Sequence, residues 1–458
     1  MSAPQPAASL AGPAGALDVG EVLRRHPDVA FDLEEHVIGT RHADRLVERL
    51  ERWRTAATTI DAAAAADAIV RGLCDGACDW IPRYRGYAKL RTLDEAPLVE
   101  KRDVRRAPDE FLSVAYEPDE LWAKTTTGSS GPPIPIWYSG DFYFDLLHLS
   151  VPKIAERARV PGPDGSGLYC LALSDNRASS DFVVAVPSGE ARLSMQVVVD
   201  ERRSETFERL FALVEELRPW CISSKPSLFE MLAAWTERGA SFGSHIPTLF
   251  VSSGAQLGEA LRERLQGLAD VVVSAYAMTE FGLIASECPA GACHVDTSAV
   301  CVEVVDDQGA PLPEGSSGEL VLSSLSNAAM PLLRYRTGDL GAVEVGRCAC
   351  GSVQPRITNM NGRKIVCYVL PSGELFSPTY FNDLFARFEG LEEFQLTQQS
   401  VGVYEVRVEL EDGHPDPTGT LERLRTYVGE AIPGSPAVVV VPTRFDTDSK
   451  FERYRTAC

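Results

Sequence analysis

The chain has 458 residues, of which 45% are hydrophobic and 24% are charged. This composition is typical of globular proteins with a sizeable core and excludes collagen-like and wholly disordered chains. Its 44 lysines and arginines and its 65 aspartates and glutamates give a net charge of −21, which disfavours binding to nucleic acid or to anionic membranes. An anionic ligand would therefore have to meet a local island of positive charge.

At about 150 residues per domain, the length predicts roughly three structural units, or one large domain and a smaller one. The first 17 residues are rich in Pro, Ala and Gly and are predicted to be a mobile tail. The N-terminus has no basic segment followed by an apolar stretch, and no run of about 18 apolar residues occurs, so we expect neither a secretory signal nor a transmembrane helix. The odd number of cysteines, eleven, favours reduced thiols or metal ligands in a cytoplasmic protein.

Residues 41–72 are rich in Ala, Leu, Arg and Glu, with apolar residues at helical spacing, and they predict a helix. Between about residues 165 and 325, short apolar segments alternate with helical ones, which is typical of α/β folds with mostly parallel sheets. We expect strands at 167–173, 219–223, 248–253 and 270–276, and helices between them at 227–238 and 258–268.

The segment 301–322 consists of two apolar stretches joined by a turn rich in Gly and Pro, which predicts a hairpin or a small barrel. After residue 364 the chain mixes strands with helices again, over about 95 residues, which suits a small α+β domain. The strands are expected at 405–410 and 437–442, and the helices at 379–388 and 421–432. The predicted fold class is therefore α/β, with a large domain of parallel sheets and a small barrel at 18–363 and a small α+β domain at 364–458.

Residues 125–133 read TTTGSSGPP. Glycines and small hydroxyl side chains let backbone N–H groups and hydroxyls converge on phosphate oxygens. The segment lacks the Gly-Lys-Ser/Thr sequence of a Walker A loop. By composition alone it fits a phosphate-binding loop or a solvated linker equally well.

Five short motifs follow one another in order. They are TTGSSGPP (126–133), SAYAMTEFG (274–282), YRTGDLG (335–341), NGRK (361–364) and DSKFERYR (448–455). Together they resemble the signature motifs of the acyl and aryl adenylate-forming enzymes, the superfamily of acyl-CoA ligases, luciferases and peptide-synthetase adenylation domains. Each motif is weak alone, and their shared order and spacing carry the resemblance.

The finer resemblance is to the phenylacetate–CoA ligase branch of this superfamily. It rests on APLVEKRDVR (96–105) and on MPLLRYRTGDLG (330–341) followed by RCACGSVQPRI (347–357), and it extends over roughly residues 80–455. Some positions depart from the family pattern. Ala277 and Ser449 stand where Gly is usual, and Pro132, Pro133 and Ile134 occupy the end of the loop where a Lys is frequent. Ile365 stands two residues past the hinge arginine, where Asp or Lys is usual.

The resemblance implies that ATP and a carboxylic acid form an acyl-adenylate with release of pyrophosphate, and that the 364–458 domain acts as a lid. It implies adenine contacts from Tyr276, Gly254 and Ala255, ribose contacts from Asp339, and ribose or phosphate contacts from Arg363. The expected phosphate-binding residues are Thr126, Thr127, Gly128, Ser129, Ser130 and Gly131.

The resemblance also implies the catalytic groups. Glu280 would hold Mg²⁺, for which a carboxylate oxygen is a suitable ligand, and Thr279 would bond the α-phosphate. Lys450 would bridge the substrate carboxylate and the α-phosphate. Arg336, Arg363 and Lys450, with Mg²⁺ on Glu280, would then form the positive island that this acidic chain requires.

Two groups of cysteines indicate a structural zinc site. Cys288, Cys293 and His294 follow the Thr-Glu motif, and Cys348 and Cys350 follow the Arg-Thr-Gly-Asp motif. Thiolates and imidazole are zinc ligands, and structural sites use four of them. The resemblance implies that the two loops meet, so we expect Cys288, His294, Cys348 and Cys350 to bind zinc, with Cys293 as the substitute. Free cysteines in loops are the alternative.

The aromatic segment 137–150 is expected to form a helix. The resemblance implies that this helix lines the acyl pocket, with core packing as the alternative role for most of its aromatic residues, and His148, Asn176, His245 or Ser252 could offer polar contacts. The branch favours an aryl acid over a fatty acid. CoA is the leading acyl acceptor, which would make the chain an aryl-CoA ligase. An amine or a carrier-protein thiol is the alternative acceptor, and a non-catalytic adenylate-binding relative is the alternative from another class. The oligomeric state is open, with a homodimer as one arrangement.

Overall fold

The computed structural model describes most of the chain. The described residues are 24–26, 29–31, 48, 50–51, 53–55, 79–85, 92–126, 134–164, 167–174, 182–186, 192–200, 203–361, 368–373, 375–376, 378, 381, 384, 388–445 and 454–457. The predicted tail at 1–17, and most of the helices expected at 41–72 and 379–388, lie outside these residues. No helix among the described residues is long and apolar enough to cross a membrane.

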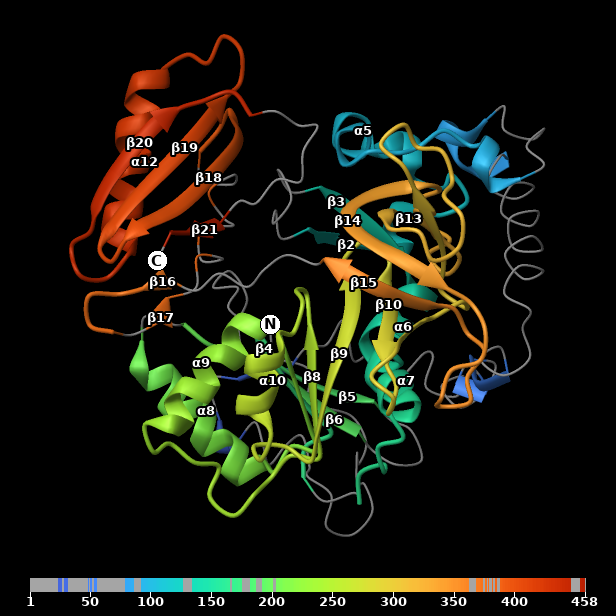
Figure 1. The fold of residues 1–458 in the computed structure, drawn as a ribbon, viewed down its shortest axis with the longest axis horizontal. Coiled ribbons are helices and arrows are strands. Elements are labelled where there is room, and N and C mark those ends of the chain that lie inside the picture. Colours follow the sequence, from blue (N-terminus) through green and yellow to red (C-terminus); the bar gives the residue numbers. More distant parts are fainter. Residues whose placement is uncertain are drawn as a thin grey trace, which may run out of the picture.

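The large sheet begins with a mostly parallel half (Figure 1). Its strands run in the order β1-β5-β6-β4-β7-β8-β9, and every neighbouring pair is parallel except β5–β6. The four expected strands are confirmed as β4, β7, β8 and β9. The strands are β1 (Ala30–Phe31), β4 (Cys170–Ser174), β5 (Phe182–Val186), β6 (Arg192–Val198), β7 (Cys221–Ser224), β8 (Leu249–Ser253) and β9 (Val271–Met278).

Helices pack on both faces of these strands, as apolar side chains on both faces require. On β8, Phe250 stacks with Phe229 of one helix layer, whereas the next residue, Val251, belongs to the cluster that contains Ile154 of the other layer. Figure 1 shows the two layers on opposite sides of the strands. One layer holds α8 (Ser204–Leu217), α9 (Pro226–Glu237) and α10 (Glu259–Leu265), and the other holds α6 (Gly140–His148) and α7 (Ser150–Arg157).

The second half of the large sheet is antiparallel, in the order β10-β11-β15-β14-β13-β12. The hairpin expected at 301–322 is confirmed as β12 and β13, but no closed barrel forms among the described strands. β11 pairs with both β10 and β15, so the hairpins extend the parallel sheet instead of closing on themselves. The strands are β10 (Gly282–Glu287), β11 (Cys293–Val295), β12 (Val300–Val305), β13 (Gly318–Ser324), β14 (Tyr335–Glu344) and β15 (Arg356–Asn361).

A separate hairpin carries the segment of the Gly/Ser/Thr loop. β2 (Leu121–Thr125) pairs with β3 (Pro135–Ser139) in antiparallel register. The helix expected over 137–150 is wrong at its start, because residues 137–139 belong to β3 and α6 begins at Gly140. Trp137 and Tyr138 favour a strand when a partner strand is present, and Ser139 caps α6 by accepting a hydrogen bond from the Phe142 amide.

Short helices lead into this hairpin. They are the α-helix α5 (Lys101–Arg106) and the 3₁₀ turns η2 (Pro82–Tyr84), η3 (Leu93–Glu95), η4 (Pro108–Phe111) and η5 (Pro118–Glu120).

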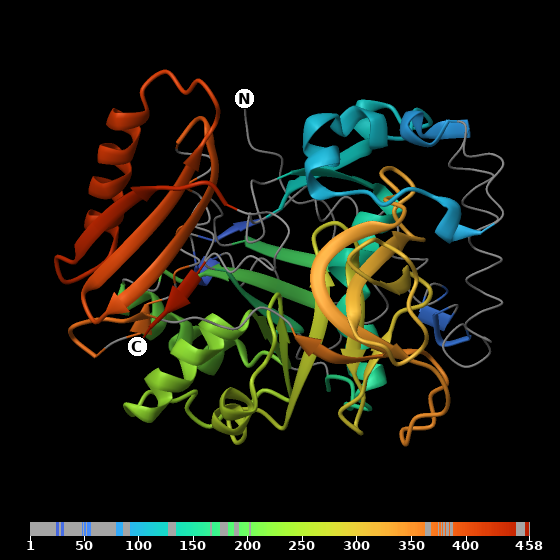
Figure 2. The same cartoon turned by 45° about the horizontal axis from the view of Figure 1, so that its top comes forward.

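The C-terminal part has its own sheet, in the order β20-β19-β18-β21, and its own apolar cluster, whose members all lie after residue 367. Figures 1 and 2 show this sheet and α12 as a distinct body beside the large sheet. An ion pair between Arg105 and Glu392 (3.9 Å) joins α5 to β18. The elements are β16 (Tyr368–Val369), β17 (Leu375–Phe376), β18 (Leu391–Ser400), β19 (Val403–Leu410), α12 (Pro417–Ala431), β20 (Ala437–Pro442) and β21 (Tyr454–Thr456).

Candidate active site

A cavity of about 430 Å³ lies at the carboxyl ends of β7, β8 and β9. Ser223, Ser253 and Gly254 line it where β7 and β8 end, and Thr279 lines it just past β9. Ligands of open α/β sheets bind at this edge of the strands. Gly254 has φ +86°, a conformation that glycine adopts without strain, and this lets the chain turn away from the cavity after β8.

The inner wall of the cavity is apolar and comes from α6, α7 and the strands they cover. Its polar rim comes from the β2–β3 hairpin and from the ends of the parallel strands. The apolar lining residues are Leu146, Val151, Ile154, Val251, Ala275, Ala277, Met278 and Leu283, and the others are Lys124, Thr125, Tyr138, Ser150, Ser223, Ser253, Gly254, Thr279 and Gly282.

Two predicted nucleotide-binding residues meet across the sheet. The Tyr276 hydroxyl, from β9, donates to Oδ2 of Asp339, from β14, at 2.9 Å. Asp339 is 9% exposed, and its own amide donates to the Thr337 hydroxyl. Tyr276 and Asp339 are 63 residues apart in sequence, so the sheet is what places a phenol ring and a carboxylate side by side.

The Thr-Glu motif forms the turn between β9 and β10. The Thr279 carbonyl accepts a hydrogen bond from the Tyr138 hydroxyl at 2.7 Å, and Oε1 of Glu280 accepts one from the Tyr335 hydroxyl at 3.0 Å. Glu280 is only 5% exposed. Burial and the nearby Glu280 charge raise the pKa of Tyr138, so this phenol stays protonated and holds the turn in place.

The predicted phosphate loop is described only at its base. The Thr126 amide donates to the Ile134 carbonyl, and the Ile134 amide donates to the Thr126 hydroxyl, each at 3.0 Å, so Thr126 closes the β2–β3 hairpin. Ala255 is described but does not line the cavity. The remaining predicted residues lie outside the described residues: Thr127, Gly128, Ser129, Ser130, Gly131, Arg363 and Lys450.

The side chains suggested for polar contacts to the acid do not line the cavity where they are described. His148 packs against Phe144, His245 contacts the Pro219 carbonyl, and Ser252 is fully buried. Asn176 lies outside the described residues. The alternation of side chains along β8 explains why the prediction for Ser252 is wrong. Ser252 and Ser253 point to opposite faces of the sheet, and Ser253 is the one that lines the cavity.

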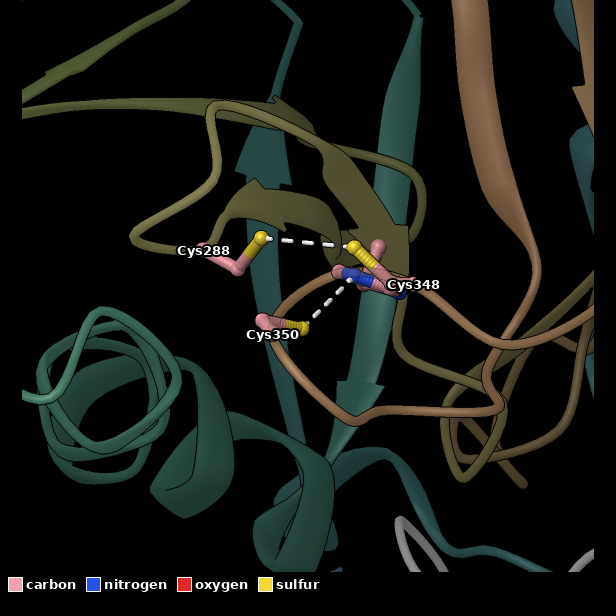
Figure 3. A group of neighbouring side chains, drawn as sticks. Cys288, Cys348 and Cys350 are labelled. Atoms are coloured by element: carbon pink, nitrogen blue, oxygen red, sulfur yellow. Dashed lines mark hydrogen bonds between the residues drawn. The ribbon is translucent and has the colours of Figure 1, made fainter.

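A second site joins the two cysteine loops. Cys288, His294, Cys348 and Cys350 place one ligand atom each within 4.8 Å of one another. Cys288 Sγ lies 4.0 Å from Cys348 Sγ, and Cys350 Sγ lies 3.4 Å from His294 Nε2. Figure 3 shows the three cysteine side chains converging from two loops. These are the four residues that the sequence predicted.

Strand pairing brings the two loops together. Cys288 follows β10, Cys348 and Cys350 precede β15, and β11 pairs with both strands, with His294 opposite Arg356. Turns shape each loop, with the Gly291 amide bonded to the Cys288 carbonyl and the Gly351 amide bonded to the Cys348 carbonyl.

The histidine of this cluster is set up as a ligand through Nε2. Its Nδ1 lies 3.0 Å from the Gln354 carbonyl oxygen, which can only accept, so Nδ1 carries the proton. Burial lowers the pKa of His294 and keeps the ring neutral. Cys293 is not in the cluster, and burial, together with Glu287, raises the pKa of its thiol to about 12.

Comparisons with known proteins show what this chain is similar to. The sequence model of the AMP-binding enzyme family matches residues 191–330. The phenylacetate-coenzyme A ligase of Thermus thermophilus is 28% identical over 288 residues, which are 61% of this chain and 62% of that protein. The same enzyme of Pseudomonas putida is 35% identical over 94 residues, 20% of each chain. The chain thus matches less than two thirds of the length of these curated relatives.

Solved structures share the fold. A 2-hydroxyisobutyryl-CoA ligase, in complex with 2-HIB-AMP and CoA, has a TM-score of 0.59 at 19% identity and covers 87% of this chain and 91% of its own. Its post-adenylation complex has a TM-score of 0.56 at 17% identity and covers 88% and 91%. Residues 191–330 thus match the AMP-binding enzyme family, and the chain is similar in sequence to phenylacetate-coenzyme A ligases and in fold to a CoA ligase. The resemblance read from the motifs is therefore confirmed.

The structure revises the positive island that the sequence predicted. Arg336 donates hydrogen bonds to Oε2 of Glu319, including one at 2.8 Å from its Nε. The side-chain hydrogen bond to Glu319 is the main reason why the pKa of Arg336 is raised. Its charge is thus neutralised on β13 and β14. Lys124, which the motifs do not mark, lines the cavity instead.

Proposed function

We propose that the chain is an AMP-forming ligase that activates a small aryl carboxylic acid and transfers the acyl group to CoA. One observation carries the proposal. Thr279 and Gly254 line one cavity at the carboxyl edge of the sheet, and β9, which supplies Ala275 and Ala277 to the wall of this cavity, also carries Tyr276, whose hydroxyl bonds Asp339. Family membership alone would leave the activity open, because relatives with one fold differ in chemistry.

The residues take these roles in the proposal. Asp339, an acceptor with two oxygens, binds the ribose hydroxyls, and the Tyr276 ring lies against adenine. Gly254 and Ala255 offer backbone groups to the adenine edge. Thr279 bonds the α-phosphate. A carboxylate is a suitable ligand for Mg²⁺, and Glu280, held by Tyr335, fits that need; bound magnesium would neutralise charge on the phosphates.

The apolar wall of the cavity and the similarity to phenylacetate–CoA ligases support an aryl acid as the substrate. The inner wall is formed by Leu146, Val151, Ile154, Val251 and Leu283, so an uncharged ring gains from burial there. The similar ligases from Thermus thermophilus and Pseudomonas putida are named for phenylacetate.

The two bodies divide the work in this proposal. Residues 18–363 form the adenylating body and residues 364–458 form a lid that brings Lys450 to the acid carboxylate and the α-phosphate. The phosphate contacts of the Thr127–Gly131 loop and of Arg363 also belong to the proposal. The separate core of the C-terminal sheet supports the division, because a body with its own core can move as a unit.

The Cys/His cluster fits a structural zinc ion. Three thiols and one imidazole form a Cys₃His set, which is one of the usual structural zinc sites. The hydrogen bond from Nδ1 of His294 to the Gln354 carbonyl fixes the orientation of the ring and leaves Nε2 free to bind a metal ion. All seven described cysteines are free, which suits the cytoplasmic location that we propose. Metal analysis of purified protein should find zinc near one per chain, and its absence would contradict the site.

The activity is tested by pyrophosphate release from ATP over benzoates, hydroxybenzoates, aminobenzoates, phenylacetates and cinnamates, followed by supply of CoA or an amine. We expect release with an aryl acid and a thioester when CoA is added. Lys450→Ala should abolish release, and unchanged release would remove Lys450 from the proposal. Product with an amine and without CoA would point to an amide synthetase, and no release with any acid would indicate a non-catalytic relative.

A further inference from the structure

Lys124 is the charged side chain among the described residues that line the cavity. It lies on β2, directly before the Gly/Ser/Thr segment 125–133. Its ammonium group lies 5.3 Å from the centre of the Tyr143 ring, and among the described residues no carboxylate lies within ion-pair distance of it. Lys124 is also exposed. Its charge is thus available to a ligand in the cavity.

The register of the hairpin places Lys124 on the same face as Ile134. Lys124 is opposite Ile136, and the mutual hydrogen bonds of Thr126 and Ile134 continue the same pairing. Residues two apart on a strand share a face, and diagonal neighbours across a strand pair lie about 7–8 Å apart. A lysine stem can span most of this distance.

Pro132, Pro133 and Ile134 occupy the stretch at the end of the loop where the related enzymes frequently carry a lysine, and Ile134 is the described residue of the three. It is fully buried, in the cluster that holds Phe144 and Phe281, so this position serves the core in the present chain. A cation on the opposite strand of the same hairpin can reach the same space.

The surroundings of Lys124 hold it toward the cavity. Tyr143 stacks with Trp122 and with Tyr138 at centroid distances of 6.0 and 5.8 Å, and Tyr138 donates to the Thr279 carbonyl. An ammonium group over an aromatic face is weakly stabilised, so it is oriented without being neutralised. The same aromatic stack thus connects Lys124 to the turn that carries Thr279.

We propose that Lys124 binds the polyphosphate of ATP and replaces the lysine that is missing from the end of the loop. This rests on the proposed function. The need for such a cation is plain, because the chain carries a net charge of −21 and Arg336 is neutralised by Glu319. A lysine acts on phosphate as a mobile point charge with three donors.

The test compares the binding of adenosine, AMP and ATP with Mg²⁺ to the full-length protein, by calorimetry, for the wild type, Lys124→Met and Lys124→Arg. Because hydrogen bonds between charged groups contribute strongly to binding free energy, we predict that Lys124→Met weakens ATP binding about 10- to 100-fold. Adenosine should bind equally to all three proteins, and Lys124→Arg should retain most of the ATP affinity. The wild-type affinity for ATP should also fall more steeply with salt than that of Lys124→Met.

Arg425→Met is the matched control, because it removes one positive charge from the surface of α12, far from the cavity in sequence and fold; it should bind ATP as the wild type does. Equal weakening of ATP and adenosine by Lys124→Met would overturn the proposal, since it would indicate lost packing. Unchanged ATP binding with a raised KM for the acid would overturn it too and assign Lys124 to the acid carboxylate. A wild type that neither binds ATP nor releases pyrophosphate would reject the proposed function itself.

Discussion

Asp296 and Lys153 form an ion pair inside the molecule. Lys153 Nζ lies 2.9 Å from Oδ2 of Asp296, and their side chains are 10% and 1% exposed. Burial by itself raises the pKa of Asp296, but the charge of Lys153 and the bond from Ser298 outweigh it, and the pKa of Asp296 is lowered. The carboxylate therefore stays ionised between α7 and the loop after β11, beside the strand that carries His294.

Asp296→Asn should destabilise the protein by about 3–5 kcal/mol, because it leaves the Lys153 ammonium buried without its counter-charge. Urea unfolding followed by circular dichroism measures this. The double variant Lys153→Met with Asp296→Leu removes both charges and should be closer to the wild type than the single variant. A single variant as stable as the wild type would show that water reaches Lys153 and that the pair contributes little.

At the scale of elements, β10 begins at the wall of the cavity. Gly282, its first residue, has φ +69°, and a Cβ there would lie 3.4 Å from Leu146 Cδ1 and from Phe142 Cζ. Any larger residue would be strained and would narrow the space between β10 and α6. The conformation of one strand end thus limits the width of the cavity at Gly282.

Gly282→Ala should raise the KM or Kd for the acid several-fold and should destabilise the protein by about 1–2 kcal/mol, the cost of a left-handed backbone for an L-residue. Gly267→Ala is the control, since Gly267 has φ +91° with nothing within 4 Å of an added Cβ. It should show a similar loss of stability and unchanged acid binding. If both variants bind the acid alike, Gly282 does not limit the pocket.

The cysteine loops make a further prediction at this scale. Cys350→Ser removes one of four ligands and should lower the zinc content to well below one per chain, with a loss of several degrees in Tm, because ligand binding to a site that exists only in the fold contributes folding free energy. Cys293→Ser should keep its zinc, since its sulfur is outside the cluster. A Cys350→Ser protein that still holds one zinc would contradict the assigned ligand set.

At the scale of the whole molecule, two bodies with separate apolar cores share one chain. The cluster of the C-terminal sheet includes Phe394, Tyr404 and Leu424 and has no member in the large sheet. The Arg105–Glu392 pair is 3.9 Å long and partly exposed, so it contributes little to holding the bodies together.

Residues 368–458 expressed alone should therefore unfold cooperatively on heating, as a domain with its own core does. Residues 1–361 should bind ATP but release pyrophosphate much more slowly than the full chain, because Lys450 is missing. Calorimetry measures the unfolding of residues 368–458, and the pyrophosphate assay measures the activity of residues 1–361. Release at the full rate by residues 1–361 would show that the C-terminal body takes no part in adenylation.

The sequence by itself determined the strands and helices of the α/β region, the order of the family motifs and the four residues of the Cys/His cluster. The elements are local features, because apolar periodicity decides each of them. Residue type marked the possible zinc ligands, and the family resemblance implied that their two loops meet. The hairpin at 301–322 could also be predicted from the sequence, because Gly and Pro mark its turn.

Only the tertiary structure decided which charged side chains face the cavity and whether the antiparallel half of the large sheet closes into a barrel. Arg336 is bound by Glu319, 17 residues away, and Lys124 faces the cavity because β2 pairs with β3 in one register. The start of α6 at Gly140, and the open antiparallel half in place of a barrel, likewise depend on partner strands. Strand pairing and charge pairing join residues that are far apart in sequence, so a local sequence pattern does not predict them. The net charge of the sequence therefore predicted that an anionic ligand needs a positive group, but only the fold identified Lys124 as that group.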